Sequence, residues 1–313
     1  MKNWEDTHEN PYPSNLMPKF LPVPNKPYPD WSRFLAAVWK HGMSHKVMDP
    51  QHAYFHSYRA HEAIKETMAR SNGASMMRPS SFLSCARQSY FFLGGEEPSP
   101  MPENIGLTFS VGHLLHELSY AAVRSAIPEG IEAEFEKKVD LPDWWPEHEK
   151  FNRGGTVDLV LRIADKDEAA KYFGFPDTLS DEVLVDFKTM GGFSWREHGK
   201  KQFDHEPDAF GYLAQLAIYR DALGFDGGAI MAGINRDALA SPLKPRWITP
   251  HILDKELARV KAAVQGALDG DDPGRQFQDR WKDNGNFYCG KGGKKGYCPF
   301  AKVCSDREPP DNG

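Results

Sequence analysis

The chain has 313 residues, 40% of them hydrophobic and 26% charged, which is typical of a soluble globular protein with one large domain or two small ones. No stretch of about 18 apolar residues occurs, and the N-terminus lacks a basic segment followed by an apolar one, so we predict neither a membrane span nor a secretory signal. The net charge of −6 argues against a surface coated in positive charge, although local basic patches or carboxylate-bound metal ions could still attract a polyanion.

Residues 1–75 are predicted to form an extension before the main domain. A proline-rich start, residues 1–30, favours extended backbone, and residues 31–40 and 52–70 favour two helices. The second helix carries three histidines, which are His52, His56 and His61. Since no carboxylate or cysteine is arranged around them, we interpret them as surface or hydrogen-bonded histidines rather than as metal ligands.

Residues 76–285 alternate between helical and strand patterns, which predicts a mixed α/β domain. The expected strands are residues 131–141, 155–163, 182–190 and 227–236. The expected helices are residues 80–93, 104–126, 208–223 and 254–268.

Finer patterns mark some of these segments. Ser80 or Ser81 is expected near the N-cap of the first helix. An apolar stripe predicts the buried face of the second helix, and its members are Val111, Leu114, Leu115, Leu118 and Ala122. Residues 164–181 form a polar insertion between two strands, and residues 244–248 form a basic stretch.

Two of the expected central strands carry acids within apolar runs. Asp158 lies in GTVDLVLRI and Asp186 in EVLVDFKTM, where alternation puts Asp186 and Lys188 on one face. If these strands pair, the two carboxylates can lie side by side, and they would repel each other unless a cation such as Mg²⁺ or Mn²⁺ lay between them. An adjacent lysine could orient or deprotonate a water molecule, which fits metal-assisted attack on a phosphodiester. A solvated strand face is the alternative, but an unpaired charge in a central strand is costly.

Polar residues on two helices match this pair of strands. Gly112 and His116 are four residues apart and share a helix face, from which the imidazole could complete a metal shell. Gln215 and Tyr219 share a face of another helix, and each is a candidate for contact with substrate. On the strand before Asp158, Glu134 or Glu136 could also reach the metal, but alternation alone does not choose between them and we assign neither.

Cysteine is concentrated near the end of the chain, at Cys289, Cys298 and Cys304, and the fourth cysteine is Cys85. In an apparently intracellular chain this favours metal or cluster ligation over disulfides. The tail around the three cysteines is rich in glycine and lysine and can bury little apolar surface. Something other than a hydrophobic core must therefore order it.

Taken in order, these motifs resemble the PD-(D/E)XK nuclease core in its RecB-like form. The matching residues are Gly112-xxx-His116, Gly155-Thr156-Val157-Asp158, Asp186-Phe187-Lys188 and Gln215-xxx-Tyr219. With one cysteine before and three after them, the chain is similar to the iron–sulfur branch of the family, which includes AddB-type helicase-nuclease domains and CRISPR-adaptation RecB-like exonucleases. The resemblance covers roughly residues 78–304 and leaves the N-terminal extension unexplained.

The resemblance implies a restriction-endonuclease-like fold, with a mixed central sheet flanked by helices, over residues 76–285. It implies a divalent metal held by His116, Asp158, Asp186 and the Phe187 carbonyl. It also implies that Lys188 is catalytic and that Gln215 and Tyr219 position the lysine or the nucleic-acid backbone.

The resemblance further implies a [4Fe–4S] cluster held by Cys85, Cys289, Cys298 and Cys304. Such a cluster would join the tail, residues 286–313, to the segment before the core. The family usually has its first two tail cysteines close together, whereas here GKGGKKGY separates them. Zn²⁺, which also accepts four cysteines, is therefore the alternative.

The predicted activity is that of a metal-dependent DNA exonuclease acting on single strands or duplex ends, in the cytoplasm of a bacterium or of a phage-infected host. One alternative is a nucleic-acid-binding or scaffold subunit of a recombination, repair or CRISPR-adaptation complex with weak or dispensable nuclease activity, because residues 1–75 could dock a protein partner. Another is a zinc-stabilised restriction-type endonuclease. The complete set of catalytic residues favours the exonuclease over the scaffold.

Overall fold

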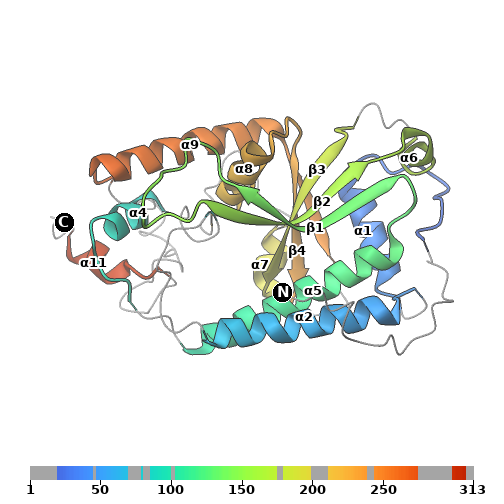
Figure 1. Cartoon of the computed structure of the whole chain (residues 1–313), viewed down its shortest axis with the longest axis horizontal. Coiled ribbons are helices and arrows are strands. Elements are labelled where there is room, and N and C mark those ends of the chain that lie inside the picture. Colours follow the sequence, from blue (N-terminus) through green and yellow to red (C-terminus); the bar gives the residue numbers. More distant parts are fainter. Residues whose placement is uncertain are drawn as a thin grey trace.

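The chain folds into a sheet with helices on both faces (Figure 1). This computed structural model describes residues 20–44, 47–69, 79, 85–99, 103–174, 179–198, 211–237, 243–273 and 298–307. The alternating helical and strand patterns thus predict the α/β class correctly. The predicted domain boundaries near residues 75 and 285 lie outside the described residues.

The sheet has five strands, in the order β1-β2-β3-β4-β5. They are β1 (Ile131–Asp140), β2 (Gly154–Ile163), β3 (Glu182–Met190), β4 (Ala229–Asn235) and β5 (Lys244–Ile248). All neighbouring pairs are antiparallel except β3 and β4, which are parallel. The inner strands β3 and β4 are mostly buried, which explains their long apolar runs.

One face of the sheet is covered by helices that precede β3 in the chain (Figure 1). They are α1 (Trp31–Gly42), α2 (Pro50–Ala69), α5 (Glu103–Ala126) and α6 (Lys166–Phe173). Helix α5 contacts β3, and α2 packs along α5. Buried side chains of α1, α5 and α6 share one hydrophobic core with β2, β3 and β4.

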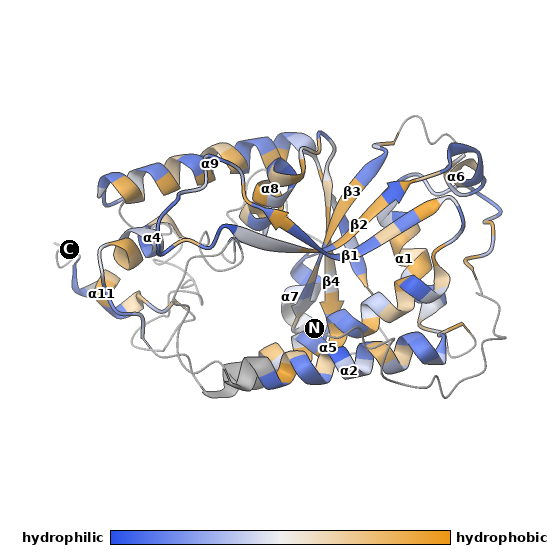
Figure 2. Cartoon of the chain, in the orientation of Figure 1, coloured by the Kyte–Doolittle hydropathy of each residue, from blue (hydrophilic) through white to orange (hydrophobic). Residues whose placement is uncertain are grey.

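The opposite face is covered by helices from the second half. They are α7 (Gly192–His198), α8 (Tyr212–Leu223) and α9 (Pro250–Asp269). Their core includes Trp145, which is fully buried. Helix α4 (Ala86–Leu93) packs against α9, and α11 (Ala301–Asp306) lies near α4 at the same end of the molecule (Figure 1). Figure 2 shows apolar stretches along the strands, whereas α2 is largely hydrophilic.

Helix α1 is an integral part of the first core. Its Trp39 indole donates a hydrogen bond of 3.0 Å to Ser119 Oγ on α5. A Cβ atom on Gly42 would lie 1.9 Å from the Ala122 carbonyl oxygen, so only glycine permits this approach of the two helices. The predicted stripe on α5 is buried at Leu115 and Ala122, but Leu114 is 41% exposed.

Helix boundaries differ from the predictions most clearly at α4, α8 and α9. Helix α8 begins at Tyr212 rather than at residue 208, because its N-cap Gly211 has a left-handed backbone with a φ of 71°. The helix expected from residue 80 is described as α4 from Ala86, because Cys85 has extended backbone and is its N-cap, while Ser80 and Ser81 lie outside the described residues. Helix α9 begins at Pro250, four residues earlier than predicted, because the Thr249 side chain caps it by accepting a hydrogen bond from the Ile252 N–H.

Four elements were not expected from the sequence, and they are α6, α7, β5 and α11. The polar insertion contains α6, whose first turn is capped by the Asp165 carboxylate. The basic stretch is strand β5, the outermost strand beside β4. In the part of the chain that the structure describes, no helix is both long enough and apolar enough to cross a membrane.

Candidate active site

Two carboxylates, Asp158 on β2 and Asp186 on β3, lie at the end of the ladder that pairs these adjacent strands. Leu159 pairs with Val185, and one further step along this register places Asp158 across from Asp186. The ladder opens there, since Oδ2 of Asp158 accepts a hydrogen bond of 2.7 Å from the backbone N–H of Phe187. The acids therefore lie where the backbone pairing of the two strands stops.

Asp186 is buried, with 2% of its surface exposed. Its two carboxylate oxygens lie 3.0 Å and 2.8 Å from the ammonium nitrogen of Lys188, and Oδ2 makes no well-aligned hydrogen bond. Burial raises the pKa of Asp186 to about 6, although the Lys188 charge lowers it, and the nearby Asp158 charge adds to the rise. The carboxylate is therefore easily protonated just below neutral pH.

Lys188 is held by groups from β3 and α8. Besides Asp186, its ammonium donates a hydrogen bond of 2.8 Å to Oε1 of Gln215. It also lies 4.9 Å from the centroid of the Tyr212 ring, within cation–π range. Its three neighbours thus hold the Lys188 ammonium, and with it a positive charge, in place at the open end of the ladder.

Asp158 is held by neutral donors instead. The Tyr120 hydroxyl on α5 donates a hydrogen bond of 3.2 Å to Oδ1, in addition to the Phe187 N–H at Oδ2. Burial raises the pKa of Asp158, and burial together with the Asp158 charge raises the pKa of Tyr120 well above its usual value. The phenol therefore stays protonated and remains a donor.

His116 lies beside Asp158, with Nδ1 3.7 Å from Asp158 Oδ2. Burial lowers the pKa of His116 to about 4, and the Lys188 charge lowers it as well. A neutral imidazole at physiological pH has a lone pair that a metal ion can use. At Gly112, one turn earlier, the nearest atom to an added Cβ would be Thr189 Oγ1 at 3.8 Å, so packing there does not require glycine.

Tyr219 and Gln215 come from α8, and both are buried. A Cβ atom on Gly155 would lie 2.5 Å from the Tyr219 ring, so this strand glycine makes room for the tyrosine. Burial raises the pKa of Tyr219 to about 12, while hydrogen bonds from the Thr156 backbone and the Gln215 side chain lower it. The same amide thus links Tyr219 to Lys188.

The donor set suits a hard divalent cation. Two carboxylates and a neutral imidazole converge from β2, β3 and α5, and carboxylate oxygens are the ligands that Mg²⁺ and Mn²⁺ prefer. The buried Asp186 Oδ2, without a well-aligned hydrogen bond, could coordinate a cation. Among the residues that the structure describes, no three His, Cys, Asp or Glu side chains are already arranged as a metal shell.

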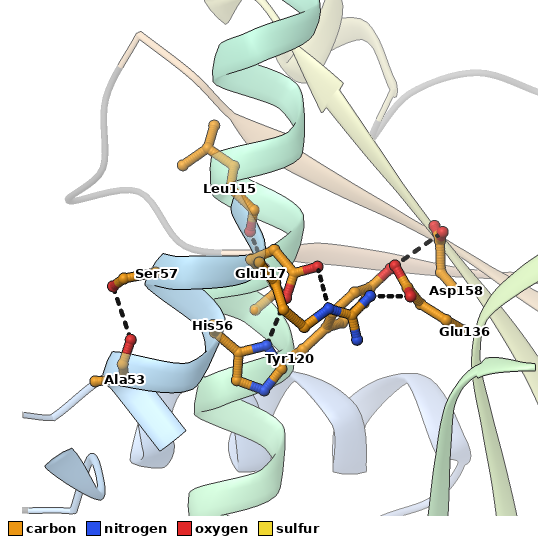
Figure 3. A network of polar contacts seen from close by, with 10 residues as sticks. Ala53, His56, Ser57, Leu115, Glu117, Tyr120, Glu136 and Asp158 are labelled. Carbon is orange, nitrogen blue, oxygen red and sulfur yellow. Dashed lines mark hydrogen bonds and ion pairs between the residues drawn. The ribbon is translucent and has the colours of Figure 1, made fainter. Parts of the chain in front are cut away.

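A polar network behind Asp158 was not predicted from the sequence (Figure 3). It contains His56, Arg59, Glu117, Tyr120 and Glu136. Tyr120 could have been found, because it lies four residues after His116 and so shares its helix face. His56 is buried and hydrogen-bonded to Glu117, which agrees with its interpretation as a hydrogen-bonded histidine, but the expectation that no carboxylate lies beside it was wrong.

Three of the four predicted cluster ligands are described, and Cys289 lies outside the described residues. Cys85 is buried at the N-cap of α4, and Cys298 and Cys304 lie on either side of the start of α11. None of these three forms a disulfide.

The segments that carry these cysteines contact each other. The Ser99 N–H donates a hydrogen bond of 2.9 Å to the Pro299 carbonyl, and the rings of Phe91 and Phe300 lie 6.0 Å apart. Arg87 reaches across to the tail, with its Nη1 3.4 Å from the Cys304 sulfur. Helix α4, together with the segment that follows it, and the described part of the tail are thus in direct contact.

Comparison with known proteins adds little. No family model matches the sequence, and no curated protein matches it. A solved structure described as the crystal structure of SSO0001 superposes with a TM-score of 0.42 at 13% identity, over 81% of this chain and 96% of that chain. A likeness this weak indicates no activity.

Proposed function

We propose that the chain is a metal-dependent deoxyribonuclease with a PD-(D/E)XK core, which degrades DNA from single strands or duplex ends. The observation that carries the proposal is that Asp158 and Asp186 adjoin the last pair of the β2–β3 ladder, Leu159 and Val185, with the Lys188 ammonium 2.8 Å from Asp186. Two acids and an amine at the open end of a buried ladder are costly for folding, and perturbed carboxyl groups of this kind cluster at functional sites.

A bound Mg²⁺ or Mn²⁺ would supply Lewis-acid activation of the scissile phosphate and of a water molecule. The ligands would be the carboxylates of Asp158 and Asp186, the imidazole of His116 and the carbonyl of Phe187. Two neutral donors hold the Asp158 carboxylate in position for this role. His116 can serve as a ligand because its lowered pKa keeps the imidazole neutral, with a free lone pair. The chain thus provides oxygen-rich coordination with one nitrogen ligand.

Lys188 would hold the attacking water or stabilise the negative charge that develops on the phosphate. Its ammonium keeps a fixed position through Gln215, at 2.8 Å. Tyr219, on the same helix face as Gln215, closes the site against β2 at Gly155. Gln215 would therefore position the lysine directly, and Tyr219 would support Gln215 through their hydrogen bond.

A cationic depression supports a polyanionic substrate. It has a volume of about 700 Å³, and the cations that line it are Arg33, Arg196, Lys244 and Arg246. The one acid in its lining, Asp30, caps α1 by accepting a hydrogen bond from the Arg33 N–H. Lys244 pairs with Gly233, which pairs with Lys188, so the depression begins two strands from the lysine of the site. Phosphates of the DNA backbone would bind there.

The test is digestion of end-labelled single- and double-stranded DNA by the full chain with Mn²⁺. Wild type should degrade the single-stranded DNA and the double-stranded DNA, because both have free ends. The rate of Asp186→Ala should be lower by at least about a thousandfold. Asp181→Ala, which removes an exposed carboxylate five residues earlier, is the matched control and should keep full activity. Equal rates for wild type and Asp186→Ala would reject the site.

Two other outcomes would identify the alternative functions. DNA binding without any cleavage by wild type would favour the scaffold role. Cleavage of closed circular DNA at the rate of linear DNA would favour an endonuclease, because an exonuclease needs a free end.

For the four cysteines we propose a [4Fe–4S] cluster. The contact of α4 and the segment after it with the tail supports this, since a cluster ligated from both sides would reinforce it. Anaerobically purified protein should be brown, and the colour should be lost in Cys85→Ala and in Cys298→Ala. Colourless protein that contains stoichiometric zinc would show that the cysteines bind Zn²⁺ and not an iron–sulfur cluster.

A further inference from the structure

Helix α2 sends two side chains into the polar network behind the site (Figure 3). Nδ1 of His56 lies 2.5 Å from Oε2 of Glu117, and Nε of Arg59 lies 3.4 Å from the other oxygen, Oε1. His56 is 1% exposed and Glu117 is 5% exposed, so this contact between α2 and α5 is dry. Arg59 is therefore held on one side by a buried acid.

On its other side, the Arg59 guanidinium binds the Glu136 carboxylate of β1. Glu136 lies between Phe135, which pairs with Leu159, and Lys137, which pairs with Val157, so its register position is directly across from Asp158. Residues opposite each other on neighbouring strands have Cβ atoms about 5 Å apart. A third carboxylate thus starts from a strand position next to Asp158 and two strands from Asp186.

The backbone at Glu136 is unusual. Its φ of 50° is positive, and among the described residues it is the one non-glycine residue in this region. Such a conformation persists only where surrounding contacts enforce it. The ion pair with Arg59 is a contact of this kind, and it directs the carboxylate toward α2.

The network also acts on Asp158 electrostatically. Glu136 brings a carboxylate to the strand position across from Asp158. The Arg59 guanidinium lies between Glu136 and Glu117 and offsets their charges. Loss of this guanidinium would leave Glu136 unneutralised next to the proposed metal ligands.

We propose that Arg59 is a positioning residue that holds Glu136 out of the metal shell, so that the ion binds Asp158 and Asp186 without a third carboxylate. The proposal rests on the proposed metal site. It assigns a role in the active site to α2, which lies outside the segment that resembles a nuclease core. Glu136 becomes a metal ligand only when Arg59 no longer binds it.

The test measures Mn²⁺ affinity, by electron paramagnetic resonance of free Mn²⁺, together with DNA cleavage by the full chain. Arg59→Ala should bind Mn²⁺ about five- to tenfold more tightly, because an additional negative charge faces the ion. It should cleave DNA at least about tenfold more slowly, because the ion no longer has its productive coordination. Arg59→Ala combined with Glu136→Gln should bind Mn²⁺ with about the wild-type affinity.

A purely structural role predicts a different result. If Arg59 only packs α2 on α5, its loss would weaken Mn²⁺ binding and the second substitution would not restore it. Unchanged or weaker Mn²⁺ binding by a folded Arg59→Ala protein would overturn the proposal. Lys65→Ala is the matched control, since it removes a cation of the same helix that pairs with Glu62 at the exposed surface, and its Mn²⁺ affinity should equal that of wild type.

Glu136→Gln alone keeps the proposal testable if Arg59→Ala does not fold. This variant should keep the wild-type Mn²⁺ affinity, and a tenfold weaker affinity would mean that Glu136 is already a ligand. Wild-type protein that binds Mn²⁺ but does not cleave DNA would contradict the proposed function alone. Wild-type protein that binds no Mn²⁺ would contradict both proposals.

Discussion

Asp186 and Asp158 lie on neighbouring strands, yet the protein holds them in opposite ways. Asp186 is almost fully buried and is paired with a lysine ammonium at 2.8 Å. Asp158 is only partly buried and is held by a backbone N–H and a phenol, both of which are neutral. One acid is balanced by charge and the other by hydrogen bonds.

The difference separates two tasks that a metal site must perform. A cation bound at Asp186 would have to share the carboxylate with the charged Lys188 ammonium, which Gln215 holds in place. At Asp158 no charge has to move, because neutral donors stay in place when a cation binds. Asp158 would therefore set the position of the ion, and Asp186 would couple the ion to the lysine.

The largest effect is expected from Lys188→Met, which removes the charge that balances Asp186. Cleavage should fall at least about a thousandfold. Near pH 8 the free energy of unfolding should fall by about 3–5 kcal/mol, since a buried carboxylate loses its partner. Near pH 5 the loss should be smaller, because Asp186 can take up a proton. Urea denaturation at both pH values measures this, and an equal loss at both would contradict the charge balance.

The next largest effect is expected on the pH dependence of the cleavage rate, which the titration of Asp186 should determine. Burial raises its pKa to about 6, so with limiting Mn²⁺ the cleavage rate should fall about tenfold per pH unit below this value. Since the folded pKa lies above the ordinary one, protonation of this group favours folding, and that contribution is lost as the pH rises through about 6. His116, with its pKa lowered to about 4, should not add to the activity profile above pH 5. A flat profile between pH 5 and 7 would contradict this.

A smaller effect is expected on the strand of Asp158, from Gly155→Ala. The added Cβ would lie 2.5 Å from the buried Tyr219 ring, which has to move, so the free energy of unfolding should fall by about 1–3 kcal/mol. Gly154→Ala is the control, because the nearest atom there, Asn152 Oδ1, lies at 3.6 Å. Thermal unfolding of both variants measures the difference, and equal stability would mean that the Tyr219 ring does not limit this position.

The smallest effect is expected from Tyr120→Phe, which removes one neutral donor from Asp158. Stability should fall by about 1 kcal/mol and cleavage by about three- to tenfold. Tyr172→Phe removes a similar buried hydrogen bond, to the Leu21 carbonyl at 3.2 Å, and should lower stability alike without slowing cleavage. Should both variants slow cleavage equally, the bond to Asp158 would have no special role.

Much of the fold follows from local patterns. The strands β2 and β3 were predictable because they are apolar on both faces, as central strands are. Strand β5 was not, because it is short, contains a proline and has only Ile248 fully buried. Helix α6 was missed within a polar insertion because it buries only Ala169, Tyr172 and Phe173.

The site divides in the same way. Asp186 and Lys188 share a strand, so alternation alone predicts that they lie together. The ion pair between Arg59 and Glu136 could not be predicted, because it depends on how α2 packs against α5 and on a positive φ in β1. Alternation assumes regular backbone and fails where one residue departs from it.

Strand β5 has a further consequence for how the molecule behaves in concentrated solution. The outer rim of a sheet normally offers unpaired N–H and C=O groups on which another chain can add a strand. Pro245 has no N–H to offer, and Lys244 and Arg246 on either side of it bring like charges together when two such rims approach. Growth of the sheet from one molecule into the next is thereby discouraged, which should favour dispersed particles over fibrous aggregates during purification.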